Sequence, residues 1–138
     1  MISLIIGNRG SGKTKKLIEL VNNAVENSNG NIVCIEKENK LKHDINIRAR
    51  LIDTDHFAVS GFDAFFGFLC GICASDYDIT DIYVDTTLRI GGRDFEQLSV
   101  FLGKVSELAK TTGVHFAFTL SADKAELPDE IFSFCKII

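Results

Sequence analysis

A chain of 138 residues with 46% apolar and 25% charged residues has the size and composition of one globular domain. Its formal net charge of −4 excludes a broad basic field, so general nucleic-acid binding is not indicated. No targeting segment is visible, and the longest apolar stretch, 62–74, is too short to cross a bilayer. We therefore expect one cytoplasmic domain, residues 1–138, with no membrane contact and with its four cysteines reduced.

The first third of the chain predicts strands around one helix. The apolar run 2–6 predicts a strand buried on both faces, as in a parallel sheet. Apolar residues recur at spacings of three and four over 13–27, which predicts an amphipathic helix. A second strand follows over 31–35. The polar segment 36–50 predicts a loop with one helical turn, and 50–53 predicts a short strand.

The middle of the chain predicts one buried helix and one strand. The helix covers 62–74, and Gly67 and Gly71 should mark close packing, since a glycine costs a helix about 1 kcal/mol. The run 79–84 predicts a strand, and 86–93 predicts a loop.

The last third repeats the alternation. Asp94 is expected to cap an amphipathic helix that closes at Thr112 and Gly113. A strand is predicted over 114–120, a short helix over 129–134 and a last strand over 135–138. Strands that alternate with helices in this way predict an α/β domain with a mostly parallel sheet of about five strands.

Between the first strand and the first helix, residues 7–14 read Gly-Asn-Arg-Gly-Ser-Gly-Lys-Thr. Phosphates need N–H donors that converge on one spot, and a glycine-rich loop that turns into a helix N-terminus supplies them. Lys13 would reach the terminal phosphates, and the Thr14 hydroxyl would hold Mg²⁺. The expected nucleotide-binding residues are Gly7, Asn8, Arg9, Gly10, Ser11, Gly12, Lys13 and Thr14; the alternative is a chance match of the pattern.

This motif, a Walker A loop, resembles that of the P-loop NTPase superfamily, and the order of elements resembles that family over most of the chain. The resemblance implies a three-layer α/β fold that binds ATP or GTP with Mg²⁺. The run Ile79-Thr-Asp-Ile-Tyr-Val-Asp85 similarly resembles a Walker B strand, in which Asp85 would orient Mg²⁺ through water. The alternative is an ordinary buried strand that ends in a capping aspartate.

The motif order resembles that of the RecA-like division, in which an additional strand separates the Walker A and Walker B strands. A whole strand–helix unit, residues 31–74, lies between the two motifs here. No Asn-Lys-x-Asp base-reading motif of GTPases is present, so the resemblance favours ATP as the nucleotide.

The residue that would activate water is missing from its usual place in this resemblance. Many relatives keep a glutamate after the Walker B aspartate, where this chain has Thr86. RecA-like proteins place a glutamate at the end of the neighbouring strand, so Glu36 or Glu38 could serve as the base. The alternative is that both are solvated loop charges.

Two further residues are candidates. Thr119, at the end of the strand 114–120, resembles a sensor that faces the γ-phosphate; the alternative is a capping residue. Arg89 lies in the loop after Asp85 and could reach a phosphate in its own subunit or a neighbour; the alternative is a solvated arginine.

The sequence therefore predicts a small, slow ATPase or ATP-dependent switch that uses Mg²⁺. A second hypothesis is a regulatory or assembly module that binds ATP without turnover, and a third, less favoured, is a small-molecule kinase. A second copy of the chain or another protein remains open as a partner.

Overall fold

The computed structural model describes residues 1–138, which form an α/β domain around one sheet. The strands are β1 (Ile2–Ile6), β2 (Asn31–Glu36), β3 (Arg50–Asp53), β4 (Ile79–Val84), β5 (His115–Leu120) and β6 (Cys135–Ile137). The helices are α1 (Lys13–Asn27), α2 (Phe62–Ser75), α3 (Thr87–Gly91) and α4 (Phe95–Thr112), and short 3₁₀ turns cover Thr54–Phe57, Lys124–Glu126 and Asp129–Ser133.

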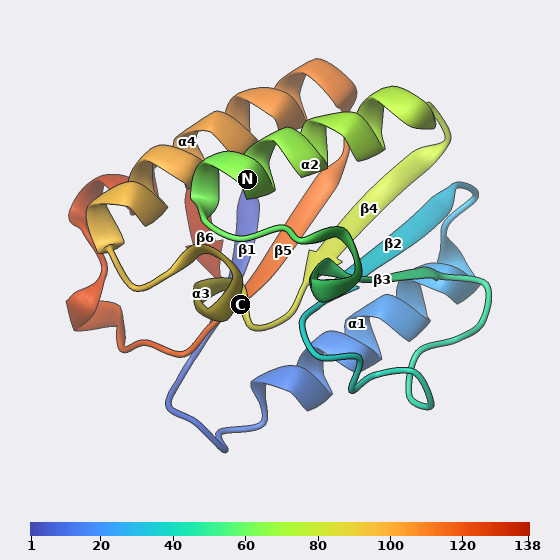
Figure 1. The fold of residues 1–138 in the computed structure, drawn as a ribbon, viewed down its shortest axis with the longest axis horizontal. Coiled ribbons are helices and arrows are strands. Elements are labelled where there is room, and N and C mark those ends of the chain that lie inside the picture. The colour runs from blue at the N-terminus through green and yellow to red at the C-terminus, as the bar shows by residue number, and fades with distance from the viewer.

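All six strands are parallel and lie in the order β3-β2-β4-β5-β1-β6. The α/β class and the parallel sheet predicted from the sequence are confirmed, and the sheet has six strands rather than about five. Strand β5 lies between β1 and β4, so the strand that leads into the glycine-rich loop and the strand that leads to Asp85 are not neighbours. Because every strand runs the same way, their carboxyl ends meet at one edge of the sheet (Figure 1).

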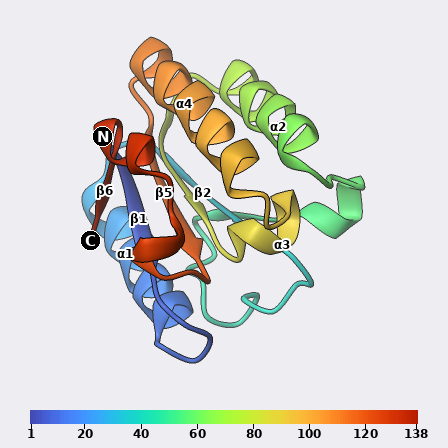
Figure 2. The ribbon, with the colours of Figure 1, turned by 90° about the vertical axis from the view of Figure 1, so that its left-hand side faces the viewer.

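Helices cover both faces of the sheet, with α1 on one face and α2 and α4 on the other (Figure 2). Leu17, Val21 and Val25 of α1 pack on strand residues such as Ile5 and Tyr83. The larger apolar cluster forms under α2 and α4. It includes five buried phenylalanines whose rings are linked by contacts: Phe62, Phe65, Phe101, Phe116 and Phe118. Because successive side chains of a strand point to opposite faces of the sheet, every second residue packs against α1 and the others against α2 and α4.

Two predictions about local structure were wrong. A side-chain carbon added at Gly67 or Gly71 would meet no atom within 4 Å, so these glycines do not mark close packing. The segment 86–93, predicted as a loop, contains the short helix α3, because Leu88 and Ile90 bury their side chains there. Gly91 permits this packing, since a side-chain carbon there would lie 2.1 Å from the Phe62 ring.

At the amino ends of the strands, polar side chains join β1, β4 and β5 on the α1 face. Ser3 Oγ lies 3.1 Å from His115 Nε2, and Tyr83 OH donates a hydrogen bond to Asp81 Oδ2 at 3.1 Å. His115 Nδ1 lies 3.5 Å from the same Asp81 oxygen, and the hydrogen bond from His115 lowers the pKa of Asp81. Ser3 is only 2% exposed, which makes this group a structural tie.

None of the helices has the length and the apolar composition that a membrane crossing requires.

Candidate functional site at the carboxyl edge of the sheet

The glycine-rich loop lies at the carboxyl end of β1 and leads directly into α1. Gly10 and Gly12 have φ of 83° and 88°, a left-handed backbone that favours glycine. No side chain caps the first turn of α1, so its N–H groups remain directed toward the loop. A helix N-terminus with this geometry can bind an anion.

The Lys13 side chain folds back over this loop. Its Nζ donates a hydrogen bond to the Asn8 carbonyl oxygen at 2.9 Å. The ammonium therefore lies across the loop, and a phosphate in the loop would meet its charge. Arg9 is exposed and forms no ion pair.

Thr14 and Asp85, 71 positions apart, meet at the same edge. Thr14 Oγ1 lies 3.2 Å from Asp85 Oδ1 and 3.1 Å from Oδ2, and it donates its proton to this carboxylate. Asp85 follows β4 and is 5% exposed, and its backbone N–H is held by the Ile35 carbonyl at 2.9 Å. The two residues predicted to serve one Mg²⁺ therefore lie in direct contact.

Thr119 joins the same carboxylate from β5. Its Oγ1 donates to Asp85 Oδ1 at 2.7 Å and accepts a hydrogen bond from the Thr86 N–H at 2.8 Å. Thr119 is 2% exposed and pairs with Ile5 across the sheet, on the α1 face. The sequence did not predict this contact with Asp85.

Glu36 and Glu38, the two candidate bases, lie in different environments. Glu36 is 2% exposed, and its carboxylate accepts hydrogen bonds from the backbone N–H groups of Lys40 and Leu41 at 2.6 and 3.0 Å. Burial raises the pKa of Glu36, these N–H groups lower it, and the charges of Asp53 and Asp85 raise it. Glu36 thus lies near Asp85, next to it in strand register, and also fixes the turn that follows β2.

Glu38 is engaged by basic side chains. It forms ion pairs with Lys40 and with Arg89 of α3. Its φ of 75° is unusual for a residue with a side chain. The structure therefore joins two candidates from distant segments, Glu38 and Arg89, and the pair connects the turn after β2 to the helix after Asp85.

Thr86 has two properties that the sequence did not predict; it was noted only as the position where many relatives keep a glutamate. Its φ of 53° is a left-handed conformation, which is strained for a β-branched residue. The hydroxyl oxygens of Thr86 and Thr87 are buried without a hydrogen-bond partner. No local sequence signal reveals either property, because the conformation depends on how β4, β5 and α3 meet.

Cys34 is buried beside this group and has no chemical role that the site requires. Burial raises its pKa far above the ordinary range, and the charges of Asp85 and Glu36 act in the same direction. The thiol therefore stays protonated and unreactive.

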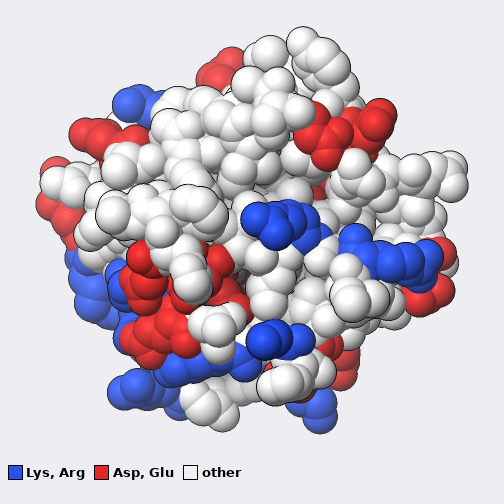
Figure 3. Space-filling view, turned by 45° about the vertical axis from the view of Figure 1, so that its right-hand side comes forward, with Lys and Arg blue, Asp and Glu red and all other residues white.

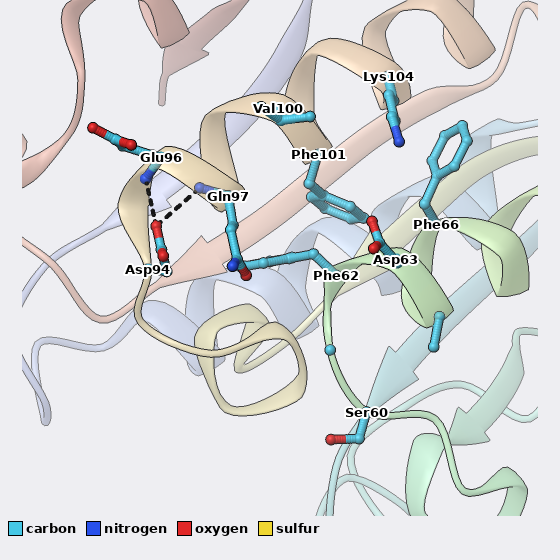
Figure 4. Close-up of a pocket in the computed structure, with 12 residues that line it drawn as sticks. Ser60, Phe62, Asp63, Phe66, Asp94, Glu96, Gln97, Val100, Phe101 and Lys104 are labelled. Carbon is cyan, nitrogen blue, oxygen red and sulfur yellow. Dashed lines mark hydrogen bonds between the residues drawn. The ribbon is translucent and has the colours of Figure 1, made fainter.

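A wide cavity of the molecule lies elsewhere. It measures about 770 Å³ and opens between the N-terminal halves of α2 and α4, over Phe62, Phe66 and Phe101 (Figure 4). Its acidic residues include Asp94, whose carboxylate caps α4 by accepting hydrogen bonds from two backbone N–H groups, those of Glu96 and Gln97. No residue of the glycine-rich loop lines it. We place the candidate site at the loop because the convergent polar groups are there.

The charged surface shows no single sign on the face drawn in Figure 3, where acidic and basic side chains lie beside each other. Several of the basic residues of the molecule are paired: Lys37 with Asp55, and Arg48 with Glu26.

No group of three or more His, Cys, Asp or Glu side chains is arranged to hold a metal ion. Mg²⁺ that arrives with a nucleotide does not need such a group, because it keeps several waters and takes one or two protein oxygens and the phosphates. The hydroxyl of Thr14 and the carboxylate of Asp85 fit that requirement, because Thr14 directs its proton to Asp85 and keeps its lone pairs free.

A scan against models of protein families finds no match to this chain, and a search of curated proteins finds no significant similarity.

Proposed function

We propose that this chain is a single nucleotide-binding domain of the three-layer P-loop type, related to the RecA-like division, and that it binds ATP with Mg²⁺ at the carboxyl edge of its sheet. The contact between Thr14 and Asp85 carries the proposal, because these residues come from two motifs 71 positions apart, were both expected to serve Mg²⁺, and meet at 3.1 Å. The position of β5 between β1 and β4 supports the proposed division.

In this proposal each element of the loop has one task. The uncapped first turn of α1 and the glycines 7, 10 and 12 bind phosphate oxygens, and Lys13 neutralises their charge. Thr14 and Asp85 would hold Mg²⁺, which polarises the terminal phosphates when bound. Asn8, Arg9 and Ser11 shape the exposed part of the loop.

Slow hydrolysis is the activity that the site supports. A water must be held in line with the γ-phosphate and must lose its proton to a base. Glu36 is the better candidate, since it lies next to Asp85 in strand register and burial raises its pKa, which makes it a stronger base than an ordinary glutamate. Arg89 would stabilise phosphate charge after it leaves Glu38.

A module that binds ATP without turnover is the second candidate. One observation favours it: both candidate bases already have partners. Glu36 accepts hydrogen bonds from two backbone N–H groups, and Glu38 forms ion pairs with Arg89 and Lys40. A base that must first break such contacts is slow.

Phosphate release by purified protein with Mg-ATP distinguishes these candidates. We expect turnover below about 1 s⁻¹, the low end of ordinary enzyme rates, and a further loss in Glu36→Gln and Arg89→Ala. Glu38→Gln tests the second base. Turnover at tens per second that all three variants retain would show that the base lies elsewhere, and binding with no turnover above that of Glu36→Gln would favour the module.

A further inference from the structure

The hydrogen bonds that join Thr86, Thr119 and Asp85 have fixed directions, because each partner can play only one part in them. A backbone N–H can only donate, so Thr119 Oγ1 must be the acceptor of the Thr86 N–H at 2.8 Å. The carboxylate of Asp85 can only accept, so the Thr119 hydroxyl donates its one proton to Oδ1 at 2.7 Å. The chain of bonds therefore runs in one direction, from Thr86 through Thr119 to Asp85.

This direction excludes a simple contact between Thr119 and a phosphate. The oxygens of a γ-phosphate only accept hydrogen bonds, so Thr119 would have to donate its hydroxyl proton to them. That proton is already donated to Asp85. Breaking the bond at 2.7 Å would leave a buried carboxylate oxygen with one donor fewer, at a cost that is large for a charged group. Thr119, which resembles a γ-phosphate sensor by its position, therefore already uses its only hydrogen-bond donor on Asp85.

The backbone of Thr86 supports the same role. Its left-handed conformation, with φ 53° and ψ 45°, directs its N–H toward β5. A β-branched residue adopts this conformation only where the surrounding structure holds it there. The contacts that hold Thr86 in this strained conformation thus also hold the N–H that orients the Thr119 hydroxyl.

We propose that Thr119 is a positioning residue, which orients the Asp85 carboxylate for a divalent cation and does not contact the nucleotide. The inference rests on the proposed function, since it concerns the same Mg²⁺ site. It differs from a sensor in what it predicts: Thr119 sets the metal dependence of binding for ADP as well as for ATP.

The test measures the affinity of the protein for ATP and for ADP by calorimetry, in EDTA and across a Mg²⁺ series. Thr119→Val removes the hydroxyl at nearly constant volume. We expect its affinity in EDTA to match the wild type, while the gain from Mg²⁺ falls about tenfold or more for both nucleotides. Thr119→Ser, which keeps the hydroxyl, should restore the gain.

Thr87→Val is the matched control. Thr87 is fully buried, and its hydroxyl has no partner, so the same change of atoms removes no hydrogen bond. In the background of Asp85→Asn, Thr119→Val should reduce the Mg²⁺ gain no further, because a residue that acts through Asp85 has nothing left to orient.

Amide hydrogen exchange gives a readout that needs no nucleotide. The Thr86 N–H should exchange slowly in the wild type and in Thr119→Ser, and faster in Thr119→Val, whether or not ligand is bound. This measurement and the rescue by serine keep the inference testable if Thr119→Val folds poorly.

Two results overturn the inference: an unchanged Mg²⁺ gain in Thr119→Val, or weaker binding of ATP with ADP unaffected, which is the behaviour of a γ-phosphate contact. If the wild type binds neither nucleotide, the proposed function fails, and the positioning role fails with it. Failure of Thr119→Val to show the effect in a wild type that binds well rejects the positioning role alone.

Discussion

Asp85→Asn should make the ligand-free protein more stable, although Asp85 is buried and hydrogen-bonded. Neither Asp85 nor Glu36 forms an ion pair, and both are at most 5% exposed. They end neighbouring strands in matching register, since Ile35 pairs with Val84. Two buried carboxylates with no cationic side chain paired to them oppose folding.

The magnitude follows from this geometry. Neighbouring strands lie about 4.8 Å apart, which places the two carboxylates about 6 Å apart. Unit charges at that distance repel by about 3 kcal/mol when the effective dielectric constant is about 20. A neutral amide accepts the hydrogen bonds of Thr14 and Thr119 less strongly, which offsets about 2 kcal/mol. We therefore expect a net gain of about 1 kcal/mol, or about 4 °C in melting temperature for a domain of this size.

Thermal unfolding without nucleotide or metal, and again with Mg-ATP, measures both consequences. The wild type should gain melting temperature with Mg-ATP, and Asp85→Asn should start higher and gain much less. Asp78→Asn is the control, because Asp78 is exposed, precedes the same strand, and its carboxylate has no hydrogen bond. A variant that is less stable than the wild type and keeps the full response to Mg-ATP would contradict the reasoning and indicate a structural aspartate.

Three further predictions concern Thr86, Glu38 and Asp81. Thr86→Glu places a carboxylate beside Asp85, and single-turnover phosphate release should become faster than in the wild type; an unchanged rate would count against the missing base as the limit. Glu38→Ala frees Arg89 from its ion pair and should tighten ATP binding but not ADP binding, which calorimetry with both nucleotides checks. The hydrogen bond from His115 makes the pKa of Asp81 lower in the folded than in the unfolded chain, so the ionised Asp81 stabilises the fold above about pH 4 and loses this effect as pH falls further. Urea unfolding from pH 6 to pH 2 should therefore show that the difference in unfolding free energy between wild type and Asp81→Asn becomes smaller. A difference that stays constant would refute this prediction.

The elements that sequence predicted best are those with strong local patterns. The strand 2–6 and the helix 13–27 appear with these boundaries, because a continuous apolar run and a clear helical period need no distant partner. The alternation of strands and helices likewise indicated a parallel α/β domain.

The parts that sequence missed depend on contacts between distant segments. The helix α3 exists because Leu88 and Ile90 bury their side chains next to α2, which no pattern within five residues reveals. Gly67 and Gly71 were expected to mark close packing, but they lie on the exposed side of α2. A glycine in a sequence shows that a side chain is absent, but it does not show whether close packing requires that absence.

The candidate site divides in the same way. The loop 7–14 was recognisable because its chemistry lies in eight consecutive residues. The pairing of Thr14 with Asp85 was expected from the resemblance. The hydrogen bond from Thr119 to Asp85 and the ion pair of Arg89 with Glu38 were not, because they join segments that only the folded sheet brings together.

The most direct test of the central claim is the affinity of the protein for Mg-ATP in wild type and Lys13→Ala. Lys13 is the charge that folds over the loop, so its loss should weaken binding at least about tenfold, or about 1.4 kcal/mol, and leave the melting temperature unchanged. Lys16→Ala removes an equal charge from an exposed position one turn away and controls for the general field. Calorimetry that gives the same affinity for wild type, Lys16→Ala and Lys13→Ala, or no binding by the wild type, would contradict the account.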